Sequence, residues 1–242
     1  MSTTVGEQAA TVCEQAMALH QQGRLHEACA GYQRALQMQP ENVQALHLLG
    51  IVALQMNDPG RAAELFGRVV HLEPGNFMAY VNRGSAYAML NQHEAAIACY
   101  DRAIAVDAES NASPFYNRAV SLQQLQRQEA ALASYDRAIA LESDLEANAY
   151  YGRGVALLEL RRHDEAIGSF DRALALGTQF AAAAYASRGS ALHARGVRTR
   201  RAPSASSISS LRIRSNTAYC TCSAASRHWP TACSMAPAIL LR

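Results

Sequence analysis

A short motif recurs along this chain at an almost constant interval. The hexapeptides that begin at Tyr100, Tyr135 and Phe170 read YDRAIA, YDRAIA and FDRALA, and successive copies lie 35 residues apart. Phe66 and Tyr32 continue the series towards the N-terminus at intervals of 34 residues. A fixed period of this length predicts stacked copies of one small structural unit.

Small residues keep constant distances from each aromatic residue of the series. One lies four positions before it, at Ala28, Ala62, Ala96, Ala131 and Ala166, and another lies further upstream, at Ala16, Gly50, Gly84, Ala119, Gly154 and Gly189. Because positions four apart share one face of a helix, we expect the small residues to let two helices approach while the ring fills the space between them. Each unit is therefore predicted to be a helical hairpin.

The period divides the chain into units. We predict helix pairs at 9–38, 43–72, 77–106, 112–141 and 147–176, followed by a single helix at 182–195. One hairpin cannot bury its apolar face alone, so stacked neighbours must share a continuous core. The predicted limits are an N-terminal extension 1–8, units 9–42, 43–76, 77–111, 112–146 and 147–181, a partial unit 182–195, and a tail 196–242.

The spacing resembles the tetratricopeptide repeat, with Gly84, Tyr87, Ala96, Tyr100 and Ala103 in the family's places. The resemblance covers about residues 9–195 and implies an all-α fold, a right-handed α-α superhelix of five helix pairs plus one helix, with an irregular C-terminal tail. Within the family, residues 45–50 (ALHLLG) and 72–76 (LEPGN) look like the arrays that precede bacterial O-GlcNAc-transferase-like catalytic domains.

Composition and motifs argue against an enzyme. All 22 basic residues are arginine, so the chain has no lysine for a phosphate-binding GxxxxGK loop, a Schiff base or a general base. No catalytic constellation is present, and we predict no cofactor. Cys220, Cys222, His228 and Cys233 would form a four-ligand zinc set, but the CxC spacing is poor for zinc, and we predict no metal.

The sequence also predicts where the chain works. No secretory signal is visible near the N-terminus, and no stretch approaches the roughly 18 apolar residues that a membrane span needs. The six cysteines show no disulfide framework. A reducing cytoplasm is therefore the predicted location.

The family resemblance implies a concave groove, lined by the first helix of each pair, that binds an extended or helical peptide. Carried over by position, the groove-facing residues are His47, Ile51, Val81, Asn82, Ser85, Tyr116, Asn117, Val120, Tyr151 and Val155. This mixture of polar and apolar side chains is typical of peptide docking. The alternative is that several of these residues pack against the next helix.

Asn82 and Asn117 stand where the glycosyltransferase-type arrays carry a ladder of asparagines that hold a peptide backbone. An amide side chain offers both a donor and an acceptor for this purpose. The ladder is broken, because the equivalent positions in the other units are Glu14, Leu48, Gly152 and Ser187. Alternatively, both asparagines bond the neighbouring helix.

Charged residues recur with the period. Units three to five carry an arginine just before the small residue of the first helix and an aspartate just after the aromatic residue of the second: Arg83, Arg118 and Arg153 with Asp101, Asp136 and Asp171. We predict arginine–aspartate pairs, within or between adjacent units, that fix the register of the stack. Duplication of a unit without any contact would leave the same pattern.

Residues 196–242 follow different rules, with seven arginines and no acidic residue. One interpretation is a disordered basic tail, and the other is a shifted reading frame of GC-rich coding sequence. Nucleic-acid binding is disfavoured because the arginines are scattered. The helix at 182–195 lacks the polar outer face of a terminal cap, so we predict that it frays, self-associates or is covered by the tail.

Together these features predict a protein–protein interaction scaffold that binds a peptide or partner segment in the groove of the first helices. The alternative is the peptide-guiding fragment of a glycosyltransferase that lacks its catalytic domain. In both cases the expected partner is a protein or peptide, and no membrane is involved.

Overall fold

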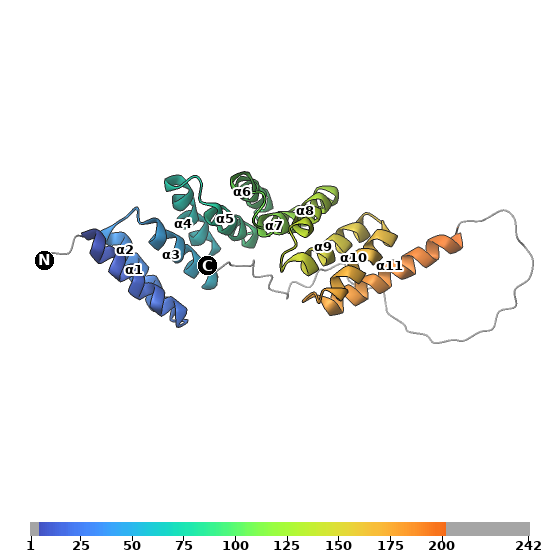
Figure 1. Ribbon diagram of the computed structural model, residues 1–242, viewed down its shortest axis with the longest axis horizontal. Helices are drawn as coiled ribbons and strands as arrows, with labels where there is room; N and C mark the ends of the chain where they lie inside the picture. The colour runs from blue at the N-terminus through green and yellow to red at the C-terminus, as the bar shows by residue number, and fades with distance from the viewer. Residues whose placement is uncertain (1–4, 202–242) are drawn as a thin grey trace, which may run out of the picture.

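The computed structural model describes residues 5–201, with the side chains of 197–201 left out. These residues form helices and no strand, and Figure 1 shows the helices following one another in sequence order along the long axis of the molecule. The helices are α1 (Val5–Gln21), α2 (Leu25–Met38), α3 (Val43–Gln55), α4 (Pro59–Leu72), α5 (Phe77–Met89), α6 (His93–Val106), α7 (Ser113–Gln124), α8 (Gln128–Ala140), α9 (Glu146–Glu159), α10 (His163–Ala175) and α11 (Ala181–Arg201).

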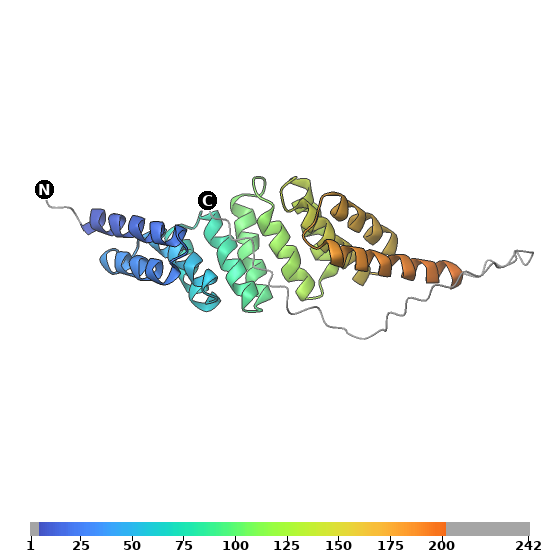
Figure 2. The ribbon, with the colours of Figure 1, turned by 90° about the horizontal axis from the view of Figure 1, so that it is seen from below.

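Each odd-numbered helix is the first helix of a unit, and the next even-numbered helix is its second helix. Consecutive helices pack together along the whole described chain, and each first helix also touches the first helix of the next unit. The second view shows the same one-dimensional stack from below (Figure 2). The predicted all-α fold, an α-α superhelix of five helix pairs followed by one helix, is confirmed.

The core repeats one contact between a glycine and an aromatic ring. The rings of the series, from Tyr32 to Phe170, are all buried. A Cβ atom added at Gly84 would lie 2.5 Å from the Tyr100 ring, and one added at Gly154 would lie 2.6 Å from the Phe170 ring. No side chain fits there, so these glycines let the second helix of the unit approach the first, as the spacing predicts.

The hairpin turns share a left-handed residue at one position. It is Gly23, Asn57 and Asn91 in the first three units, with φ angles of 75°, 59° and 58°. Gln126 and Arg161 occupy the same position in units four and five, with φ angles of 56° and 57°. Glycine and asparagine tolerate this conformation better than glutamine or arginine, so the last two turns form less easily.

Side-chain caps begin the first helices of units two and three. The Asn42 side chain accepts a hydrogen bond from the Ala45 backbone at 2.9 Å, and Asn76 accepts one from Ala79 at 3.0 Å. Asparagine at this position satisfies a backbone donor that the helix leaves free. These caps fix where α3 and α5 start, and therefore where the groove-facing side chains lie.

Two helices run beyond their predicted limits. The helix α1 begins at Val5, inside the predicted extension 1–8, and continues through Gly6 into the first unit. The helix α11 continues to Arg201 instead of ending near residue 195. Residues 181–201 contain no proline, so no residue of this kind interrupts the helix. The predicted properties of residues 202–242, including their reading frame and zinc ligands, lie outside the described residues.

Candidate functional site

A hollow of about 1050 Å³ opens between α1, α3 and the linker that precedes α5. Its walls combine apolar and polar side chains without any lysine or arginine. The lining residues are Met17, His20, Gln21, Gly23, Leu25, Val43, Gln44, His47, Leu48, Ile51, Gln55, Glu73 and Asn76. Because the first helices provide most of this wall, the hollow belongs to the face on which the groove is predicted.

Two histidines connect the first helices of three successive units. His20 donates from Nε2 to Oε1 of Gln55 at 2.8 Å, which joins α1 to α3. Asn82 donates from Nδ2 to Nε2 of His47 at 3.4 Å, which joins α5 to α3. The acceptor role of Nε2 places the His47 ring proton on Nδ1.

The rings of these histidines also pack on the core. The His47 ring stands edge-on to Phe66, with 5.4 Å between the ring centroids. Burial lowers the pKa of His47, and the nearby Glu73 carboxylate opposes this shift to a smaller extent. His47 is therefore neutral at neutral pH and can accept the hydrogen bond from Asn82.

The predicted groove residues divide into two groups by burial. Five are half-buried and reach the surface, namely His47, Tyr116, Val120, Tyr151 and Val155. The other five, Ile51, Val81, Asn82, Ser85 and Asn117, are buried. Of the ten, only His47 and Ile51 line the described hollow.

The two asparagines are in different states. The Asn82 amide is 1% exposed and bonded to His47, which is the alternative role considered from the sequence. Asn117 is 8% exposed, and its buried Nδ2 group has no hydrogen-bond partner among the described residues. Asn117 thus keeps a donor that no group in residues 5–201 uses.

Gln55, Glu73 and Asn76 line the hollow but were missed by the sequence analysis. Gln55 lies four residues after Ile51 and so shares its helical face, which was a usable signal. Glu73 and Asn76 belong to the linker between units. Their approach to the hollow depends on how sharply the stack curves, which the period does not reveal.

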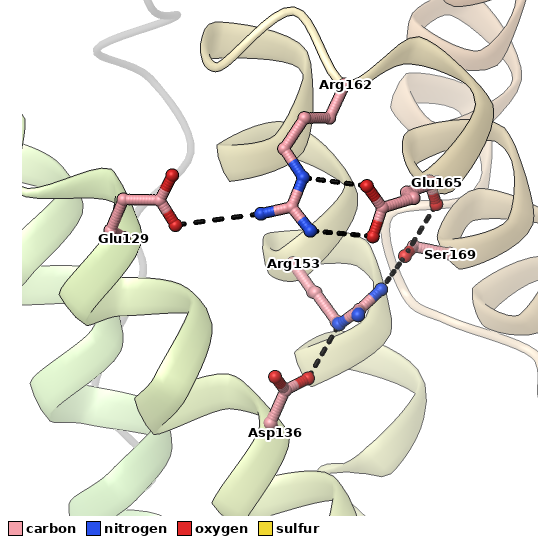
Figure 3. A network of polar contacts seen from close by, with 6 residues as sticks. All are labelled: Glu129, Asp136, Arg153, Arg162, Glu165 and Ser169. Atoms are coloured by element: carbon pink, nitrogen blue, oxygen red, sulfur yellow. Dashed lines mark hydrogen bonds and ion pairs between the residues drawn. The ribbon is translucent and has the colours of Figure 1, made fainter.

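The arginines of the first helices pair with the preceding unit. Arg153 in α9 donates from Nε to Asp136 of α8 at 2.7 Å and from Nη1 to Oγ of Ser169 in α10 at 2.7 Å (Figure 3). Arg118 makes the same two contacts, with Asp101 at 2.6 Å and Ser134 at 2.7 Å. Each arginine therefore joins the second helix of one unit to both helices of the next.

The predicted pairing is confirmed for Arg118 and Arg153 and wrong for Arg83. Among the described residues, Arg83 has no carboxylate partner, because Gly67 stands where the later units have an aspartate. Arg83 instead donates to Oη of Tyr87 at 3.2 Å and lies over its ring. Asp171 pairs with Arg188 of α11 at 2.5 Å, an arginine that the sequence analysis did not include.

A second series of ion pairs was not predicted. Arg162 lies 3.6 Å from Glu129 of the preceding unit and also binds Glu165 through two hydrogen bonds of 2.7 Å (Figure 3). Arg127 and Glu94 occupy the same positions one unit earlier, 3.8 Å apart. The constant offset of 33 residues between acid and base was the available signal.

Comparison with known protein families identifies the repeat. The family model described as "Tetratricopeptide repeat" matches residues 47–114 and 116–181, which together exceed half of the chain. A second model, "TPR repeat", matches residues 16–57. The chain belongs to the tetratricopeptide repeat family. Its units are therefore tetratricopeptide repeats, or TPR units.

The solved structures that resemble this TPR protein agree. "Crystal structure of MamA protein" is 26% identical, with a TM-score of 0.67, and the alignment covers 73% of this chain and 95% of MamA. "Crystal structure of YrrB: a TPR protein with an unusual peptide-binding site" is 19% identical, with a TM-score of 0.62, over 76% of this chain and 90% of the other. At that identity, the likeness to YrrB shows the fold alone.

One curated relative matches a short segment. The protein "Essential for maintenance of the cell wall protein 1" of Saccharomyces cerevisiae is 32% identical over 77 residues, which is 32% of this chain and 8% of the yeast protein. Among residues 5–201, no helix combines the length and hydropathy needed to cross a membrane.

Proposed function

We propose that this TPR protein is an interaction scaffold that binds a peptide segment of a partner protein in the hollow between α1 and α3. The observation that carries the proposal is the hollow itself, with apolar side chains such as Leu48 and Ile51 beside the polar groups of Gln44 and Gln55. Apolar contacts supply affinity for a peptide, and amide side chains hold its backbone whatever its sequence.

The charge of the residues that line the hollow indicates which charge a bound peptide should carry. Glu73 is the lining residue with a formal charge at neutral pH, and no lysine or arginine lines the hollow. We expect a peptide that carries a lysine or arginine next to apolar side chains. The basic side chain would pair with the Glu73 carboxylate, and the apolar side chains would contact the apolar wall. An acidic peptide tail would have no cation to pair with there.

The alternative is a peptide-guiding array of a glycosyltransferase. It would need free asparagine amides along the inner face, and the Asn82 amide is engaged by His47. Of the two asparagines, Asn117 has a donor without a partner in the described part of the chain, and one hydrogen bond contributes about 0.5–1.5 kcal/mol. The contacts therefore favour the scaffold, and both the glycosyltransferase role and the cytoplasmic location stay predictions.

Selection from a phage-displayed library of random peptides on the full chain tests the proposal. Selected peptides should carry apolar residues beside a basic one, and their affinity should fall when Glu73 is changed to Gln. The variant Gln44→Trp fills the hollow from an exposed position and should weaken binding by about tenfold or more.

Gln37→Trp is the matched control, because Gln37 is exposed on α2 and does not line the hollow. It should leave the affinity unchanged. Peptides that bind both tryptophan variants as tightly as the parent chain would place the binding surface elsewhere and refute the proposal.

A further inference from the structure

The last helix, α11, has a face that no described residue covers. Tyr185 lies on this face, and its side chain is 64% exposed. Leu46 and Phe115, which hold the same position in units two and four, are buried, and Tyr80 and Tyr150, which hold it in units three and five, are half-buried. The position is therefore at least partly covered in those units, whereas no described residue covers Tyr185.

Gly189 lies on the same face, one helical turn after Tyr185. In the earlier units the equivalent glycines, Gly50, Gly84 and Gly154, receive an aromatic ring from the second helix. Nothing within the described residues lies within 4 Å of a Cβ atom added at Gly189. The helix therefore presents a site shaped for a ring, without a ring in it.

The chain does not turn back over this face at the usual place. The helix α9 ends at Glu159, and the equivalent residue in α11 is Ala194, yet α11 continues to Arg201 (Figure 2). Residues 202–242 contain arginines and no acidic residue, whereas every paired second helix carries acidic residues. Residues 202–242 therefore differ in charge from the second helices that cover this face in the earlier units.

The face of α11 is complementary to itself. At a spacing of three and four residues, small and large side chains alternate along it: Ala182, Tyr185, Gly189 and Leu192. If two such helices cross antiparallel about a two-fold axis, Tyr185 lies opposite Gly189 of the second copy, and Leu192 lies opposite Ala182. A parallel crossing would instead place tyrosine against tyrosine.

Charge favours the same arrangement. Arg188 and Arg195 are held by Asp171 and Asp164, at 2.5 Å and 3.4 Å, so the middle of α11 carries little free positive charge. The further arginines of the helix stand at its C-terminal end, from Arg198 onward. An antiparallel crossing keeps these ends of the two helices apart.

We propose that two copies of the chain associate through α11, crossing antiparallel so that Tyr185 of each copy fills the place beside Gly189 of the other. The second copy thus supplies the ring that the second helix supplies elsewhere. The dimer joins the two arrays end to end and leaves the hollow between α1 and α3 free, so this association is separate from peptide binding.

Sedimentation velocity of the full chain over a range of concentrations tests the proposal. The chain should show a monomer–dimer equilibrium, and Gly189→Leu should raise the dissociation constant by about tenfold or more, because it closes the site for the ring. Gly168→Leu is the matched control, since Gly168 is an exposed helical glycine of α10 with nothing within 4 Å. It should leave the dissociation constant unchanged.

A swap of the two side chains gives a stricter test. Tyr185→Ala and Gly189→Tyr should each weaken the dimer, and the double variant should restore it, because a small residue again faces a tyrosine. Both residues are exposed in the single chain, so neither change disturbs its folding, which circular dichroism checks. A chain that is monomeric at every concentration, or a dimer insensitive to these changes, would overturn the proposal.

Discussion

Arg118 of α7 binds Asp101 of α6 at 2.6 Å, although the two residues belong to different units. Its guanidinium also binds Ser134 of its own unit, so one side chain ties three helices together. Because a solenoid gains stability only from contacts within units and between neighbours, such a bridge sets the angle between adjacent hairpins. The series covers units three to six and is absent at Arg83.

Gly67→Asp should complete the series. The new carboxylate would lie beside Arg83, whose Nη2 atom is 3.4 Å from a Cβ atom at this position and belongs to a flexible side chain. We expect the free energy of unfolding in urea to rise by about 0.5–1 kcal/mol, from the ion pair and from removal of a helical glycine. Gly67→Asn, which has the same shape without charge, should give only part of this gain.

Gly84→Ala should weaken the core. The added methyl group would stand 2.5 Å from the Tyr100 ring, which is buried and cannot move away freely. A loss of about 1–3 kcal/mol in the free energy of unfolding is expected. Gly168→Ala, at an exposed helical glycine with open space around it, should stabilise the chain instead. Equal effects of the two substitutions would contradict the ring–glycine packing.

Arg161→Asn should stabilise the turn between α9 and α10. Arg161 has a φ angle of 57°, and asparagine already fills the same position at Asn57 and Asn91. The gain should be about 0.5–1 kcal/mol in thermal or urea unfolding. Arg172→Asn, at an exposed position inside α10, should have the opposite sign because asparagine is a poor helix former.

Lowering the pH should reduce the free energy of unfolding of the chain, because His47 becomes protonated. Burial lowers the pKa of His47 in the folded chain, so the unfolded chain takes up the proton first as the pH falls below about 6.5. The stability that depends on neutral His47 is therefore present above this pH and is lost below it. Urea unfolding of the parent chain and of His47→Gln should show a smaller pH dependence in the variant.

The sequence predicted the fold well because the fold depends on local spacing. The interval between Tyr100 and Tyr135 sets the length of the hairpin, and a small residue, Gly84 or Ala119, stands 16 positions before each ring. The direction of the arginine bridges could not be read from it, because Arg118 lies 17 residues after Asp101 and 18 residues before Asp136. The rotation between units decides which aspartate it meets.

The candidate site was harder to predict for the same reason. A groove carried over by position extends evenly along all units, and it included buried residues such as Val81 and Ser85. The hollow described here lies at units one and two, where the linker residue Glu73 reaches its wall. The end of the last helix was also predicted wrongly. The repeat pattern stops at Arg195 and Gly196, but the helix α11 continues to Arg201.

The claim that peptides bind between α1 and α3 is tested most directly by photo-crosslinking. A benzophenone side chain placed at Gln44 faces the hollow, and the same group at exposed Gln37 on α2 does not line it. With a peptide selected on the parent chain, mass spectrometry should find the crosslink from position 44 and none from position 37. Crosslinks of equal yield from both positions, or only from position 37, would contradict the account.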